Sequence, residues 1–190
     1  MVGALAAVLA AAPAPAAGPR VLAVDGRSGS GKTGLAAALA DALAAPVVHL
    51  DDLYPGWEGL AAAVELLRGV LAGLRSGRPA RHPVWDWAAG AYRGAVQLPT
   101  TGVVVVEGVG AGCAAAVEVL VWLEAETGVR RRRALARDGE VFAAHWDSWA
   151  AQEERLFAAH DVRARADVVL RPGEVDAGPG AGPVRWTRVR

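Results

Sequence analysis

The sequence predicts an α/β fold, with a parallel β-sheet of about five strands and helices on both faces. Short aliphatic runs alternate along the chain with stretches whose apolar residues repeat at helical spacing. The valine-rich runs are apolar at every position, which is typical of parallel strands buried on both faces. A glycine-rich segment separates the first run from the first helical stretch, so that strand, loop and helix follow directly.

Length and composition indicate one domain, spanning 1–190. The chain has 190 residues, 53% of them hydrophobic, which is enough for one well-buried α/β domain. The formal net charge is zero, so we expect neither a nucleic-acid partner nor an anionic membrane surface. Cys113 is the single cysteine, which excludes an intrachain disulfide and suits a reducing compartment.

The first residues, 1–19, are rich in Ala, Leu and Pro but lack the basic start of a secretory signal. We therefore expect a short N-terminal helix that packs on the domain. No other apolar run approaches the length of a membrane span. These features predict a cytoplasmic protein.

The first strand, Val21 to Val24, leads into the segment Gly26-x4-Gly31-Lys32-Thr33. Glycines let successive backbone N–H groups turn around an anion, and the following helix N-terminus adds partial positive charge. Phosphate is the natural occupant, with the lysine ammonium at its oxygens and the threonine hydroxyl on Mg²⁺. The pattern predicts the P-loop of an NTPase fold, with nucleotide-binding residues Gly26, Ser28, Gly29, Ser30, Gly31, Lys32 and Thr33.

Lys32 is the only lysine among the twenty Lys and Arg residues. Heavy use of Ala, Gly, Arg, Pro and Val suggests a GC-rich coding sequence, which replaces lysine by arginine wherever either residue serves. An ammonium fits between phosphate oxygens where a planar guanidinium does not. The retained lysine therefore supports a catalytic, phosphate-contacting role.

A helix over Thr33–Ala44 and a second strand over Val47–Leu50 follow the loop, and Asp51 comes directly after that strand. Residues just beyond the carboxyl ends of parallel strands line the ligand crevice. Asp51 is thus expected beside the P-loop, where its carboxylate can accept the proton of an acceptor hydroxyl or orient it. An ordinary loop or capping aspartate is the alternative.

Three further buried strands are predicted at 103–106, 119–123 and 168–170. Glu107 ends the first of these, which predicts a metal shell made with Thr33 and Asp51. Apolar residues over 60–74 repeat at helical spacing, whereas 75–99 lacks periodicity and predicts an inserted substrate loop or hairpin. The tail over 174–190 is Gly/Pro-rich and predicts loose structure, although 184–189 also fits an edge strand.

Three arginines share one face of a predicted helix over 127–139, namely Arg130, Arg133 and Arg137. A helix that folds over the P-loop as a lid would present these guanidinium groups to the phosphates. The alternative is a solvated basic face that pairs with Glu153 and Glu154.

Aromatic side chains are concentrated near the expected acceptor site. Trp57, Trp85 and Trp87 lie after Asp51 or in the insertion, where flat apolar surfaces can stack a planar substrate; filling the core is the alternative. The histidines show no metal-ligand spacing, and no catalytic role is assigned to them: His49, His82, His145 and His160.

Taken in order, these segments resemble the uridine kinase and phosphoribulokinase family of P-loop kinases over roughly residues 20–173. The P-loop is one shared segment, and V-E-G at 106–108 and the arginine lid are two more. The sequence D-D-L-Y at 51–54 stands for the family's D-x-F-Y, and P-V-W-D-W with Arg93 stands for P-x-Y-D-F followed by Arg. The last shared segment is R-P-G at 171–173.

The resemblance implies roles for residues at the matching positions. It implies that Asp51 is the catalytic base, that Glu107 joins the magnesium shell and that Arg171 lies near the adenine. It implies that the lid arginines bind the phosphates. Arg130 would bind the nucleotide, and Arg133 and Arg137 would take part in catalysis. The implied acceptor-binding residues are Asp51, Tyr54, Glu58, Trp85, Asp86 and Arg93.

We therefore expect a kinase that uses ATP and Mg²⁺ to phosphorylate a hydroxyl of a small metabolite, a nucleoside being one candidate. Uridine kinases carry a histidine soon after the aspartate of their Y-D-F motif, where this chain has Ala88-Ala89-Gly90. Loss of that base-reading partner disfavours uridine and cytidine. The alternatives are a non-nucleoside acceptor, such as a sugar phosphate or pantothenate-like compound, and an ATP-binding switch without a small acceptor.

Overall fold

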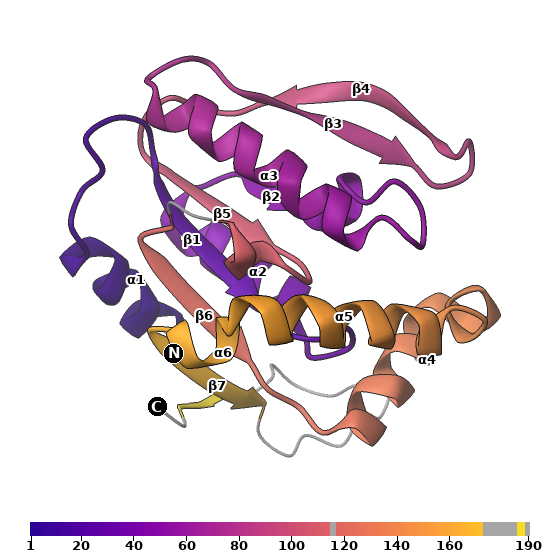
Figure 1. Cartoon of the computed structure of the whole chain (residues 1–190). Helices are drawn as coiled ribbons and strands as arrows, with labels where there is room; N and C mark the ends of the chain where they lie inside the picture. Colours follow the sequence, from indigo (N-terminus) through magenta and orange to yellow (C-terminus); the bar gives the residue numbers. More distant parts are fainter. Residues whose placement is uncertain (115–116, 173–185, 189–190) are drawn as a thin grey trace.

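The computed structural model describes residues 1–114, 117–172 and 186–188, and a six-stranded sheet forms its centre (Figure 1). Its strands are β1 (Arg20–Asp25), β2 (Val47–His49), β5 (Val103–Glu107), β6 (Val119–Leu123), β7 (Val168–Pro172) and β8 (Trp186–Arg188). The order is β2-β5-β1-β6-β7-β8, with every neighbouring pair parallel except β7 and β8. The predicted parallel α/β sheet is confirmed, with an antiparallel edge strand added.

Helices cover both faces of this sheet (Figure 1). They are α1 (Val2–Ala11), α2 (Lys32–Leu43), α3 (Leu60–Arg75), α4 (Thr127–Ala143), α5 (Trp146–His160) and α6 (Val162–Arg165), with short 3-10 turns η1 (Leu50–Asp52) and η2 (Ala111–Cys113). Val21 and Ala23 of β1 belong to a core cluster shared with α3 and α5. Leu22 and Val24 belong to a second cluster shared with α1 and α2, because alternate strand residues face opposite sides.

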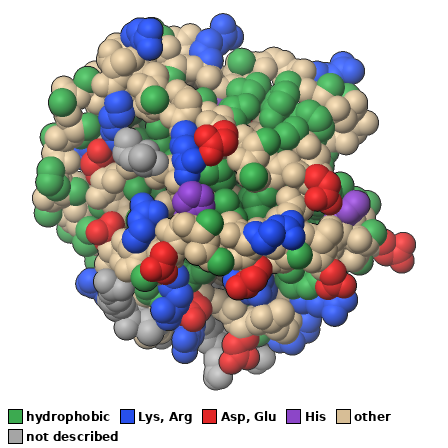
Figure 2. Space-filling view, viewed as in Figure 1, with side chains coloured by type: hydrophobic (Ala, Val, Ile, Leu, Met, Phe, Trp, Pro, Cys, Tyr) green, Lys and Arg blue, Asp and Glu red, His purple; other side chains and the backbone are tan. Residues whose placement is uncertain are grey.

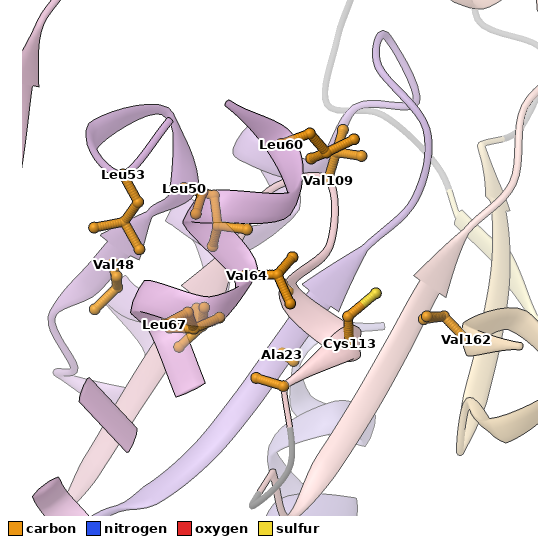
Figure 3. Packing of buried hydrophobic residues seen from close by; sticks show 14 of the residues in the cluster. Ala23, Val48, Leu50, Leu53, Leu60, Val64, Leu67, Val109, Cys113 and Val162 are labelled. Carbon is orange, nitrogen blue, oxygen red and sulfur yellow. The ribbon is translucent and has the colours of Figure 1, made fainter. Parts of the chain in front are cut away.

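The apolar face of α3 packs against the segment that directly follows β2 and holds it in place. Leu60, Val64 and Leu67 lie close to Leu50 and Leu53 in one buried cluster (Figure 3). All five side chains are at most 2% exposed. Burial of this much apolar surface holds η1 against the end of β2, and so positions the residues at the strand end.

The predicted insertion over 75–99 is a hairpin for most of its length. Its strands β3 (Arg81–Asp86) and β4 (Ala91–Gln97) form a separate two-stranded antiparallel sheet. Arg75 belongs to α3 instead. The space-filling view has the same orientation as Figure 1. It shows a group of hydrophobic side chains on the surface over α3 and this hairpin (Figure 2).

The bounds predicted for the N-terminal helix need correction. The N-terminal helix spans only Val2–Ala11 of the expected 1–19, because prolines at 13, 15 and 19 remove backbone donors from the remainder. It does pack on the domain, through buried Leu5 and Leu9.

Most of the expected loose tail over 174–190 falls outside the described residues. The part that is described, Trp186–Arg188, forms β8 against β7, which confirms the alternative of an edge strand within 184–189. Within the described ranges no helix is long and apolar enough to cross a membrane.

Candidate active site

The P-loop connects β1 to α2 and wraps the N-terminus of that helix. Gly29 has φ +77° and Gly31 has φ +98°, a region in which a side chain is strained, so the loop depends on glycine at both positions. A pocket beside it is lined by Gly29, Gly31, Lys32, Thr33, Arg133, Ala134 and Arg137. The loop, the start of α2 and the α4 arginines therefore meet around one open space.

The loop packs directly against the backbone of α4. A Cβ atom built on Gly29 would lie 2.1 Å from the carbonyl oxygen of Arg130. At that separation either the loop or the helix would have to move. Gly29 thus serves close approach as well as turn geometry.

Asp25 anchors the base of the loop from inside the protein. Its Oδ1 accepts hydrogen bonds from the N–H of Gly26 at 2.6 Å and of Gly110 at 3.0 Å, and its Oδ2 accepts from Gly112 at 2.8 Å. Complete burial raises the pKa of Asp25 to about 6, against the opposing effect of these N–H groups. The carboxylate ties the P-loop to the segment that follows β5.

Lys32 lies at the first position of α2 and is 8% exposed. Its Nζ donates a hydrogen bond to the carbonyl oxygen of Arg27, 3.1 Å away within the same loop. Burial lowers the pKa of Lys32, and the nearby carboxylate of Glu107 opposes that shift. The ammonium is thus held at the pocket wall, where a phosphate oxygen can replace its carbonyl partner.

Thr33 and Glu107 meet beside the pocket. The Thr33 hydroxyl donates to Glu107 Oε1 at 3.3 Å, and His49 Nδ1 lies 2.7 Å from the same oxygen. The hydrogen bond to Glu107 raises the pKa of His49, which partial burial opposes. The histidines lack metal-ligand spacing, so the sequence predicts no catalytic role for them. The pairing of β2 with β5 in the tertiary fold is what brings His49 to Glu107.

This corner suits Mg²⁺ bound together with a nucleotide. Among the described residues, no group of three or more His, Cys, Asp or Glu could hold a metal ion alone. Mg²⁺ normally keeps several waters and is held by one or two protein oxygens plus substrate phosphates. A threonine hydroxyl and a carboxylate at the edge of the P-loop pocket fit that requirement.

Asp51 lies in η1, one turn beyond the end of β2. Asp51 is exposed to solvent, yet loss of hydration and then the charge of Glu107 raise its pKa. The charges of Arg137 and Lys32 act in the opposite direction. The structure therefore brings the predicted base, lysine, glutamate and lid arginine into one electrostatic group.

The lid arginines divide into two kinds. Arg133 and Arg137 line the pocket, and Arg137 also makes two hydrogen bonds to Asp138, at 2.8 and 2.7 Å. Arg130 is 6% exposed and donates to the carbonyl oxygens of Ala125 at 3.1 Å and Ser28 at 3.2 Å. The three guanidinium groups therefore do not form the single phosphate-facing row that helical spacing predicted.

Glu153 of α5 contacts the P-loop from outside the pocket. Its Oε1 accepts a hydrogen bond from the N–H of Ser28 at 2.7 Å, and Oε2 lies 3.7 Å from Arg27 and 3.9 Å from Arg130. The basic-face alternative anticipated acidic partners on this helix, but not a contact with the loop backbone.

Trp57 joins the hairpin to the junction between α4 and α5. Its ring stacks on His145, with centroids 4.4 Å apart and 11° between planes, and on Phe142 at 5.5 Å. Trp87 packs against it at 4.9 Å and donates its indole N–H to the carbonyl oxygen of Asp51 at 3.1 Å. Trp87 is 41% exposed, so its indole offers surface beside the predicted base.

The other predicted acceptor residues have different surroundings. Tyr54 is 2% exposed and donates its hydroxyl to Val109, which places it in the core. Asp86 Oδ1 accepts from the N–H groups of two hairpin-turn residues, Ala88 at 3.0 Å and Ala89 at 2.9 Å. Asp86 thus stabilises the turn of the hairpin.

The remaining predicted site residues do not line the pocket beside the P-loop. Trp85 packs edge-on against Tyr92, and Arg93 lies 3.6 Å from Asp86. Glu58 is exposed. Arg171 lies 3.8 Å from Glu124 at the end of β7, and Gly173 of the R-P-G motif falls outside the described residues.

No protein-family model matches this sequence, and no curated protein matches it. A solved structure of a possible uridine kinase from Bacillus stearothermophilus is similar over 88% of this chain and 96% of that chain, with TM-score 0.62 and 23% identity. A protein of Silicibacter sp. TM1040, provisionally named a fructose transport system kinase, is similar over 86% of this chain and 94% of that one, with TM-score 0.58 and 24% identity. The protein therefore has the fold of the P-loop kinases.

Proposed function

We propose that this protein is a kinase that transfers the γ-phosphoryl group of ATP to a hydroxyl of a small metabolite. The observation that carries the proposal is the convergence of Lys32, Thr33, Glu107 and Asp51 at one edge of the sheet, with Arg137 facing them from α4. Phosphoryl transfer requires mainly positioning and charge neutralisation, which this set supplies. The similarity of fold to proteins named as kinases supports the same class of reaction.

Each residue has a distinct task in this reaction. The loop amides and the Lys32 ammonium bind the β- and γ-phosphates, and Arg133 and Arg137 neutralise the charge that develops on the transferred group. Thr33 and Glu107 would hold Mg²⁺, which supplies positive charge to the phosphate oxygens. Asp51 accepts the proton of the attacking hydroxyl, a role that its raised pKa suits.

The exposed surface beside Asp51 favours an acceptor with a flat or apolar face. Trp87 is 41% exposed beside Asp51, and Tyr92 of the same hairpin is 38% exposed. Asp86 is occupied by the hairpin turn, and alanines stand where uridine kinases carry the base-reading histidine. These features support a hydroxyl compound other than uridine or cytidine.

A panel of nucleosides, sugar phosphates and other hydroxyl metabolites tests the proposal, with ADP release as the measurement. We expect one class of acceptor to raise ADP release well above the rate with ATP and Mg²⁺ alone. In that assay Asp51→Asn should lower kcat by at least about a hundredfold, because general base catalysis typically contributes that much. Slow hydrolysis that no acceptor stimulates would favour an ATP-binding switch instead.

A further inference from the structure

We propose that His49 is a positioning residue for the metal shell, and that it acts by holding the carboxylate of Glu107 in one orientation. The inference deepens the proposed function and rests on it, since it concerns Mg²⁺ bound with ATP. His49 ends β2 and Glu107 ends β5, and the two residues are direct neighbours in the parallel pairing of these strands. The sheet itself therefore brings the imidazole to the carboxylate.

The geometry assigns the contact to one ring nitrogen. Nδ1 of His49 lies 2.7 Å from Oε1 of Glu107. An ionised carboxylate can only accept hydrogen bonds, so Nδ1 carries the proton and donates it. The Thr33 hydroxyl donates to the same oxygen from 3.3 Å.

Two donors on Oε1 fix the rotamer of a side chain that is itself only 3% exposed. When Thr33 turns its hydroxyl oxygen toward a metal ion, His49 remains as the donor that keeps Glu107 in place. Groups that orient metal ligands in this way typically change metal affinity 10- to 100-fold when they are removed. His49 thus acts on the metal through Glu107 and not by direct contact.

Two substitutions of His49 separate this role from general damage. The side-chain amide nitrogen of asparagine occupies nearly the position of Nδ1, whereas that of glutamine reaches the position of Nε2. His49→Asn should therefore keep the hydrogen bond to Glu107, and His49→Gln should lose it. The imidazole is 42% exposed, so both variants should fold, which thermal unfolding would verify.

The measurement is the dissociation constant of Mn²⁺ from the complex with a non-hydrolysable ATP analogue, followed by electron paramagnetic resonance. We expect His49→Asn to stay within about threefold of the wild-type value and His49→Gln to bind Mn²⁺ about tenfold more weakly. Nucleotide affinity measured in EDTA should be equal in all three proteins, which a general loss of structure would not give.

Equal Mn²⁺ affinity in wild type and His49→Gln would overturn the positioning role and leave the kinase proposal intact. A loss of equal size in both variants would also overturn it, because the Nδ1 contact would then not be the determinant. Absence of any Mn²⁺-nucleotide complex in the wild type would refute the proposed function itself, and with it this inference.

Discussion

Glu153 accepts a hydrogen bond from the backbone N–H of Ser28, with 2.7 Å between Oε1 and the nitrogen. The carboxylate is 1% exposed and also lies within 4 Å of the guanidinium groups of Arg27 and Arg130. A helix more than a hundred residues away in the chain thus holds the tip of the phosphate-binding loop. The loop's shape depends on this contact as well as on its glycines.

Substitution of Glu153 by alanine should therefore impair nucleotide binding. It leaves a partly buried N–H without its partner and removes the buried charge facing two arginines, at a cost of about 1–3 kcal/mol. We expect the free energy of unfolding to fall by that amount and the dissociation constant for ATP to rise about tenfold. Urea unfolding and calorimetric titration would measure the two effects.

The neighbouring residue provides the control. Glu154 also pairs with Arg27, at 2.6 Å, but its side chain is 71% exposed. Glu154→Ala should change stability by less than about 1 kcal/mol and leave ATP affinity unchanged. Similar effects of the two substitutions would show that the contact with Ser28 does not organise the loop.

A second prediction concerns the close approach of the P-loop and α4. Gly29→Ala introduces a methyl group 2.1 Å from the carbonyl oxygen of Arg130 at a φ of +77°, so ATP binding should be lost or greatly weakened. Gly34→Ala is the matched control, because nothing lies within 4 Å of its Cβ and it lies in α2. That change should stabilise the protein by about 0.5–1 kcal/mol and retain nucleotide affinity, as thermal unfolding and titration would reveal.

A third prediction distinguishes the arginines of α4. Arg133 and Arg137 line the pocket, whereas Arg131 and Arg132 are exposed on the same helix and do not line it. Arg137→Ala should lower kcat by about a thousandfold, the lower end of the range for an arginine that stabilises phosphoryl transfer. Arg131→Ala and Arg132→Ala should retain kcat within about threefold; if steady-state kinetics gave all three the same loss, the lid assignment would fail.

The fourth prediction is a pH dependence of stability that arises from Asp25. Burial raises its pKa to about 6 in the folded protein, above the ordinary value of 3.8. The folded state then binds this proton more tightly than the unfolded state, so the favourable contribution is complete below pH 4 and is lost as pH rises through 6. The full difference is about 3 kcal/mol.

Comparison with Asp25→Asn isolates this effect, because asparagine does not titrate. Unfolding free energies of both proteins should be measured by urea denaturation between pH 4 and pH 7. The wild type should gain stability relative to the variant as the pH falls. A constant difference across that range would mean that Asp25 titrates near its ordinary value.

Much of the fold and part of the site could be predicted from local pattern. The P-loop is a contiguous segment, and Asp51 and Glu107 each follow a valine-rich strand, so rules about strand ends were enough to bring them together. The position of the Arg130 guanidinium could not be predicted in this way. Helical spacing put it in line with Arg133 and Arg137, but the packing of α4 on the loop turns its guanidinium toward Ser28.

By itself the sequence determined the strand, loop and helix that bind phosphate, and the carboxylates at the ends of the next strands, because these depend on residues near one another in the chain. Only the tertiary structure decided what surrounds them. The pairing of β2 with β5 brings His49 to Glu107, and the packing of α5 brings Glu153 to the loop. Both contacts join residues far apart in the sequence. Strand order and helix packing determine which residues meet, so no local sequence pattern predicts these contacts.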